Sequence, residues 1–257
     1  MSVSLMVHLP RMKRAWFAFA AFAIVYTIAP GADARRRKPR VRYQDVHMIR
    51  PAAVYADMSK KACLAELSKR KIAHKEAAKS PGVLAPVRLT SNIGGVTFRS
   101  DAPERERNVS SAEVFDCRLV LALHDWSKIL ASHGIDEVRT ITAWRPPPRS
   151  WPRGKQADRH PGALAVDIRA FGKKTAGKTP KVWLSVEKDF RGKIGAPVCG
   201  KSTQQGATDA AKTLRAVLCE ASKKGLFTSI LTPNYDRAHR DHVHVEIRPH
   251  TEWTLFL

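Results

Sequence analysis

Three histidines lie within six residues near the C-terminus, in the segment Ala238-His239-Arg240-Asp241-His242-Val243-His244-Val245-Glu246-Ile247. Side chains of a β-strand alternate between the two faces of the sheet. In a strand here, His242, His244 and Glu246 would therefore share one face, and the intervening apolar residues would pack on a core. The polar face would present imidazoles, which are common metal ligands.

A second pair of ligand types lies upstream, where His160 and Asp167 are seven positions apart. A hydrolytic metal site needs three imidazole or carboxylate ligands and keeps a fourth position open for water. His160, Asp167 and His244 meet that count. Pro161-Gly162 can turn the chain between the first two ligands, and His242 would lie beside the metal ion. The pattern predicts a zinc site with these three residues as ligands.

Other interpretations of the same residues are available. His160 and Asp167 could form a surface ion pair, and a His-x-His sequence is a weak signal in a basic chain. A non-haem iron site also uses two histidines and one carboxylate, but nothing in the sequence indicates a cosubstrate for oxygen chemistry. The joint presence of both motifs, each on a predicted strand of an exported chain, favours a metal site.

The elements around these motifs predict an α+β fold, in which one antiparallel sheet carries the metal site and helices flank it. Arg145 ends one of the predicted strands and is followed by a long, proline-rich loop, residues 146–159. Helices are expected at residues 57–76, 110–132 and 208–224. Strands are expected at residues 138–145, 163–171, 182–186, 227–231 and 242–247, with a hairpin formed by residues 87–90 and 95–99.

The charge of the chain is unusual for a globular protein. Of its 257 residues, 45 are Lys or Arg and 23 are Asp or Glu, which gives a net charge of +22. Such a balance favours contact with polyanions, such as nucleic acid, anionic cell-wall polymers or acidic membrane surfaces. No nucleic-acid-binding module is visible, so specific binding to nucleic acid is not expected.

The N-terminus has the pattern of a secretory signal peptide, residues 1–34. Arg11, Lys13 and Arg14 precede an apolar run, residues 15–29, and the small-x-small sequence Ala32-Asp33-Ala34 follows it. The run is short for a membrane span, although an uncleaved anchor is the alternative. We expect export to the periplasm or cell envelope, no transmembrane helix after cleavage, a basic linker at residues 35–56 and one domain at residues 57–257.

Four cysteines follow the predicted signal, and an exported chain with an even number usually pairs them. Three pairings are open. Cys63 with Cys117 and Cys199 with Cys219 is favoured because sequence neighbours close the shorter loops. A structural zinc site made of the four thiolates is the alternative, but no C-x-x-C pair is present.

The two metal-binding motifs resemble the zinc motif of the superfamily that contains lysostaphin-type and D-alanyl-D-alanine metallopeptidases and hedgehog domains. Cys63-Leu64-Ala65-Glu66-Leu67, Pro86-Val87-Arg88-Leu89 and the segment around His239 and His242 more closely resemble the bacterial extensin-like protein family. The resemblance covers about residues 60 to 248. It implies a zinc ion held by His160, Asp167 and His244.

The resemblance also implies roles for three further residues. His242 would act as general base or transition-state stabiliser, because no glutamate base precedes the last ligand. His239 would support the site, as in the histidine pattern of murein endopeptidases. Arg145 would bind a substrate carboxylate or carbonyl oxygen, for which a guanidinium fork is suited.

Taken together, these features predict a zinc-dependent hydrolase that cleaves peptide bonds of cell-wall peptidoglycan, of the murein endopeptidase or D,D-/L,D-carboxypeptidase type. The alternative is a non-catalytic exported domain that keeps the metal-site fold and binds an anionic cell-envelope polymer. A third hypothesis, an exported nucleic-acid binder, is supported only by the positive charge of the chain.

Overall fold

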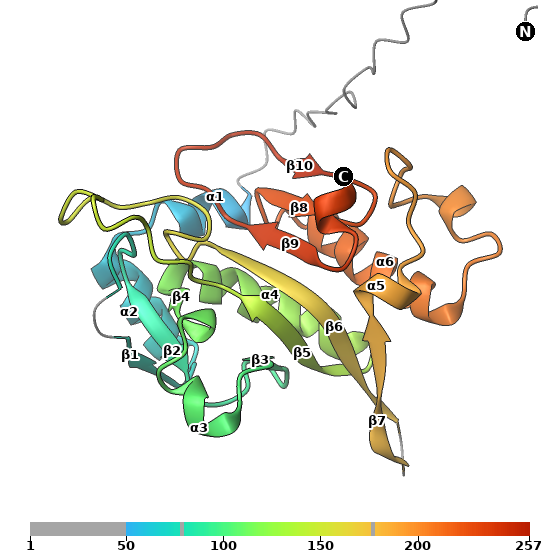
Figure 1. Cartoon of the computed structure of the whole chain (residues 1–257), viewed down its shortest axis with the longest axis horizontal. Helices are drawn as coiled ribbons and strands as arrows, with labels where there is room; N and C mark the ends of the chain where they lie inside the picture. The colour runs from blue at the N-terminus through green and yellow to red at the C-terminus, as the bar shows by residue number, and fades with distance from the viewer. Residues whose placement is uncertain (1–49, 78–79, 176–177) are drawn as a thin grey trace, which may run out of the picture. The chain divides into compact units, whose positions relative to one another are not determined.

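The computed structural model describes residues 50–77, 80–175 and 178–257 (Figure 1). The predicted signal peptide and residues 35–49 of the predicted linker lie outside these ranges. Within them the fold is mixed α+β, with six helices, one seven-stranded sheet and one three-stranded sheet. None of the described helices combines the length and the apolar character that crossing a membrane would require.

The larger sheet has the strand order β10-β8-β9-β6-β5-β3, with β7 paired to β6 as well. Its strands are β3 (Thr97–Ser100), β5 (Ile135–Thr142), β6 (Ala165–Thr175), β7 (Lys178–Ser185), β8 (Ser229–Leu231), β9 (Val243–Glu246) and β10 (Leu255–Phe256). The sheet is not purely antiparallel as predicted, because β3 pairs parallel to β5 and β10 parallel to β8. Helix α4 (Cys117–Ser132) lies in the connection from β3 to β5, which is long enough to bring the chain back to the same end of the sheet.

Strand β6 is the longest strand and positions the motifs. It pairs with β5 along one edge, and with both β9 and β7 along the other. The strand expected at residues 182–186 thus lies mostly in β7 and pairs with the strand that carries Asp167. In the ladder between β6 and β9, Asp167 stands directly opposite His244.

The smaller sheet contains β1 (His74–Glu76), β2 (Pro86–Leu89) and β4 (Phe115–Asp116), in the order β1-β2-β4. The predicted hairpin of residues 87–90 and 95–99 is wrong, since β2 pairs with β1 and β4 whereas β3 pairs with β5. Only Ile93 and Val96 bridge across the expected turn. Both strands form their ladders with more distant partners, which bury Val87 and Phe98 in the common core.

The helices besides α4 are α1 (Pro51–Ala56), α2 (Lys60–Lys69), α3 (Glu104–Arg107), α5 (Val186–Asp189) and α6 (Asp209–Lys223). Helix α6 matches its prediction, with Thr208 as N-cap and Gly225 in the left-handed region at φ 62° after its end. Helix α2 is shorter than predicted. Helix α1 lies within the range predicted as a linker, yet its Ala52, Tyr55 and Ala56 are buried.

Helix α4 is the core helix, and Figure 1 shows it behind strands β5 and β6. The indole of Trp126 packs edge-on against Phe171 of β6 and against Phe227, with ring centroids 5.9 Å and 5.4 Å away. Its Nε1 donates to the carbonyl of Val217 in α6, at 3.1 Å. One indole thus joins two helices and the sheet, which holds the apolar face of β6 in place.

The N-terminus of α4 lies later than the sequence predicted, because residues 111–113 form a 3₁₀ turn and residues 115–116 pair with β2. Asp116 caps the helix through its contact with the Arg118 amide, 3.0 Å away. Its carboxylate also binds the Arg118 guanidinium and the amide of Ala85, and both charged side chains are buried. The Asp116 amide donates to Ala163 at 2.9 Å, so this capping group is tied to the loop that carries His160.

The two favoured cysteine pairings are confirmed. Cys63 is bonded to Cys117 and Cys199 to Cys219, and no free cysteine remains. The first disulfide joins α2 to α4, and the second joins the loop after α5 to α6. Disulfides are typical of proteins that fold outside the cytoplasm.

We expect both disulfides to stabilise the fold by restricting the unfolded chain. The double substitution Cys63→Ala/Cys117→Ala should lower the free energy of unfolding by about 4 kcal/mol, and Cys199→Ala/Cys219→Ala by about 3 kcal/mol, because the first pair spans 54 residues and the second 20. Urea unfolding followed by circular dichroism measures both. A loss below about 1 kcal/mol for either pair would contradict this expectation.

Candidate metal centre

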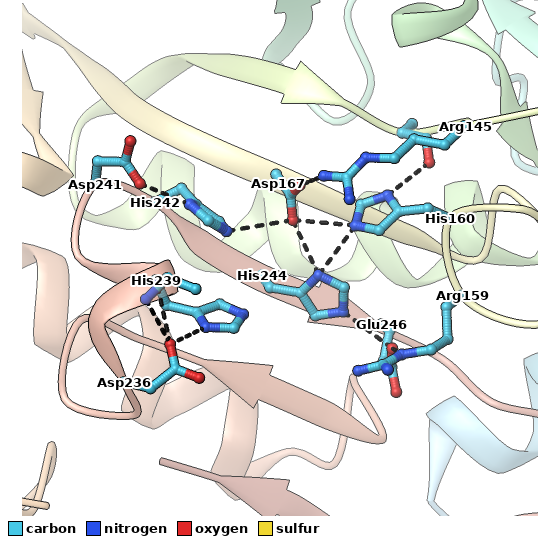
Figure 2. Close-up of polar contacts among 12 residues, drawn as sticks. Arg145, Arg159, His160, Asp167, Asp236, His239, Asp241, His242, His244 and Glu246 are labelled. Atoms are coloured by element: carbon cyan, nitrogen blue, oxygen red, sulfur yellow. Dashed lines mark hydrogen bonds and ion pairs between the residues drawn. The ribbon is translucent and has the colours of Figure 1, made fainter. Parts of the chain in front are cut away.

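Three donor atoms from distant segments converge on one point. The Nε2 of His160 lies 3.2 Å from Oδ1 of Asp167 and 3.2 Å from Nδ1 of His244, and the last two atoms are 2.9 Å apart. All three residues are buried. They form a His/Asp/His group that could hold a metal ion, and Figure 2 shows the three side chains pointing toward one another.

The size of this triangle suits a small divalent metal ion. With edges of 2.9–3.2 Å, a point just above its plane lies about 2 Å from all three atoms, which is the usual bond length for histidine nitrogen and carboxylate oxygen ligands. Two imidazoles and one carboxylate also match the donor set of an open site. The residues therefore fit a divalent metal ion.

His160 is held in the right tautomer by the loop around it. Its Nδ1 faces the carbonyl of Ala143 at 3.0 Å, and a carbonyl can only accept, so the proton lies on Nδ1 and the lone pair on Nε2 faces the triad. Arg159 and Ala163 flank the ligand at positive φ angles of 53° and 52°. Between them Gly162 allows a close approach, since a Cβ there would lie 1.9 Å from the carbonyl oxygen of Ala157.

His244 is oriented by the carboxylate of Glu246, which lies on the same face of the strand. The Nε2 of His244 donates to Oε2 of Glu246 at 2.9 Å, which leaves Nδ1 for the triad. The same oxygen accepts from Nε of Arg159 at 3.0 Å. Glu246 is thus a buried carboxylate with two partners, and it fixes the imidazole through the strand that both residues share.

The electrostatics of the site favour a cation. Burial alone would raise the pKa of Asp167, but its close polar contacts with His160 and His244 favour the charged carboxylate and hold that pKa well below its usual range. Burial alone would lower the pKa of His244, yet Asp167 and Glu246 raise it. Glu246 has a lowered pKa despite its burial, because His244 and Arg159 stabilise its charge. Two ionised, buried carboxylates therefore surround the imidazole of His244.

Arg145 lies beside the triad rather than apart from it. Its Nη2 donates to Oδ2 of Asp167, the carboxylate oxygen that does not face the two histidines. The Arg145 side chain is still 58% exposed, in contrast to 3% for Asp167. Its guanidinium can therefore contact both the ligand and a molecule in the solvent.

The other two histidines lie next to the triad, each held by an aspartate. Nδ1 of His242 donates to Asp241 at 2.9 Å, and its Nε2 is 3.7 Å from Oδ1 of Asp167. His239 lies in a 3₁₀ turn, and its Nδ1 donates to Asp236 at 2.7 Å. The rings of His239 and His242 have centroids 5.0 Å apart. In both residues the bonded Nδ1 leaves Nε2 as the acceptor (Figure 2).

A cavity of about 610 Å³ opens over these groups. Every residue that the sequence predicted for the site lines it: His160, Asp167, His244, His242, His239 and Arg145. Pro146, Pro147 and Pro148 form part of its wall, so the beginning of the long basic loop contributes to the cavity. A cavity of this size can accept a peptide-sized ligand segment.

Several partners of the site were not predicted. Glu246 could have been found from its position two residues after His244 on one strand face, and Asp241 and Asp236 from their proximity in sequence to His242 and His239. No sequence signal distinguishes Arg159 from the other arginines. Its contact with Glu246 depends on the fold, because the two residues are 87 positions apart.

Comparison with known proteins agrees with the resemblance seen in the sequence. A family model described as the extensin-like protein C-terminus matches residues 61–255. The matched range contains the triad, both disulfides and the cavity. No curated protein and no solved structure matches the chain.

The role of Glu246 can be tested directly. Glu246→Gln keeps the shape of the side chain but removes the charge that His244 and Arg159 share, so the affinity for Zn2+ should fall about 10- to 100-fold. Competition with a chromophoric chelator measures this. Glu252→Gln, at an exposed position outside the cavity, is the matched control and should bind like the wild type. Equal affinities for the two variants would show that Glu246 does not tune the site.

Proposed function

The chain belongs to the extensin-like protein family, and from the geometry of its buried triad we propose that it is a zinc-dependent peptidase or amidase acting on cell-wall peptidoglycan. The observation that carries this proposal is the convergence of His160, Asp167 and His244 at 2.9–3.2 Å in the floor of an open cavity. Two imidazoles and one carboxylate with a free fourth position are the ligand set of hydrolytic zinc sites.

A zinc ion bound there would activate water near neutral pH and polarise a substrate carbonyl. The residues around the triad support the remaining steps. Nε2 of His242 is an acceptor near Oδ1 of Asp167, so His242 can take a proton from the attacking water and return it to the leaving amine. The hydrogen bond that Nδ1 of His242 donates to Asp241 keeps the imidazole in the tautomer that this role requires.

Arg145 and His239 would position the substrate. Arg145 uses one nitrogen on Asp167, and its exposed guanidinium has other N–H groups that can donate to a carbonyl or carboxylate of the ligand. His239 holds its Nε2 in the same cavity through Asp236. A charge-assisted donor such as the Arg145 guanidinium would stabilise the negative charge that develops on a carbonyl under attack.

The proposed substrate follows from charge and compartment. The chain carries a net charge of +22, and its two disulfides are typical of an extracytoplasmic protein. Peptidoglycan is an anionic polymer with amide bonds in that compartment. We therefore infer that the protein is exported and meets the wall polymer by electrostatic attraction.

The proposal predicts separable effects of the histidines. His160→Ala and His244→Ala should lose bound zinc and all release of soluble muropeptides from purified sacculi. His242→Ala should keep the zinc but lower the rate about 10²- to 10⁴-fold, because only the proton transfer is removed. Metal analysis and chromatography of the released products measure both, and His250→Ala, whose side chain is 89% exposed, is the control.

Three outcomes would count against the proposal. The first is that the purified, folded wild type binds no zinc, and the second is that the His160→Ala and His244→Ala variants release the same products as the wild type. Binding of zinc and sacculi without any cleavage would instead favour a non-catalytic envelope-binding domain. If cleavage occurs, the masses of the products distinguish a cut cross-link from a shortened stem peptide.

A further inference from the structure

A second cavity of about 300 Å³ lies next to the metal centre and has no role in the chemistry above. It is lined by α5, by the loop that follows it, and by residues 233–240. The last segment contributes to both cavities, since Arg237 and Arg240 line the second one while His239 lines the first. One short stretch of chain thus connects the two.

The second cavity is positively charged. Arg191, Arg237 and Arg240 line it, and none of the three guanidinium groups forms an ion pair with a carboxylate among the described residues. Of its two acidic residues, Asp236 accepts bonds from the amides of Ala238 and His239 and from the His239 ring. Its charge is therefore compensated locally, and the arginines outnumber the remaining acid, Glu187.

The walls of this cavity are held by buried side chains rather than by mobile surface contacts. Arg215, buried in α6, donates to the carbonyls of Phe190 at 3.0 Å and Arg191 at 3.3 Å. Asn234, also buried, donates from Nδ2 to Ala196 at 2.9 Å, and its own carbonyl accepts from the Gly195 amide at 2.7 Å. The arginine-bearing loop and residues 233–240 are thus joined to each other.

The fit between these two walls is close. A Cβ at Gly192 would lie 2.0 Å from Oδ1 of Asn234, so only glycine allows the loop to approach. The backbone of the walls is therefore preorganised, and binding a ligand would order mainly the exposed side chains of the three arginines. Three free guanidinium groups in such a cavity suit an oxyanion, because each can donate two parallel hydrogen bonds.

We propose that this cavity is an anion-binding subsite, which holds a carboxylate or phosphate group of the wall polymer while an amide bond of the same polymer lies over the metal centre. The inference rests on the proposed function for the identity of the polymer. The subsite itself depends on the arginines and not on the metal. Binding through it would place the polymer in one orientation across residues 236–240.

The test measures binding without hydrolysis. The full chain, freed of metal with a chelator, is sedimented with purified sacculi, and the apparent affinity of Arg237→Ala/Arg240→Ala is compared with the wild type. We expect a loss of about tenfold or more, as for the removal of charge-assisted hydrogen bonds. The control is Lys61→Ala/Lys223→Ala, which removes the same charge from exposed positions outside both cavities and should weaken binding less than about twofold.

Two treatments of the sacculi identify the bound group. Amidation of the carboxylates, or removal of phosphate polymers with hydrofluoric acid, should abolish the difference between the wild type and the arginine variant, depending on which group is bound. Equal losses for the arginine and lysine variants, or a difference that survives both treatments, would overturn the proposal. A protein that cleaves nothing would refute the hydrolase but leave this binding difference intact.

Discussion

The candidate site depends on the register between β6 and β9, in which Asp167 stands opposite His244. Side chains alternate along a strand, so a slip of β9 by one residue would turn His244 into the core and bring a neighbouring valine to the face that carries Asp167. That register is supported on both sides, because β6 is also paired with β5 and β9 with β8. The valines are buried in the common core, and the same alternation presents the candidate ligands on the opposite face.

Two buried carboxylates add a second constraint. A charged group inside a protein is stable only when it is paired and hydrogen-bonded. Asp167 and Glu246 are both 3% exposed at the side chain, and their arginine partners, Arg145 and Arg159, stand at the two ends of the proline-rich loop. The loop is thereby closed over the site at its base, where the Arg145 amide also donates to the carbonyl of His160 at 3.2 Å. The same two arginines therefore neutralise the buried carboxylates and fix the ends of the loop that borders the cavity.

The start of α4 connects the site to the stable core of the fold. Asp116 and Arg118 form a buried ion pair there, and breaking such a pair by removing one partner typically costs about 3–5 kcal/mol. The Asp116 amide reaches Ala163, in the turn between His160 and β6. The Cys63–Cys117 disulfide closes the same region. The candidate metal ligand His160 therefore lies on a loop, but on a loop that is hydrogen-bonded to the start of the buried helix α4.

The linear chain is enough to single out His160, Asp167 and His244 as candidate ligands, because few side-chain types bind metal ions and these three lie on or beside predicted strands. It also indicates helix α6, from the local signals of its two ends, and both disulfides, from the pairing of cysteines that are neighbours in sequence. It does not indicate the parallel pairing of β3 with β5, the separation of β2 from β3, or the contact of Arg159 with Glu246. These depend on which distant segments gain the most from packing together, and local preference carries no information about that choice. The folded structure alone decides them, because the free energy of a buried pair is set by neighbours that only the tertiary arrangement supplies.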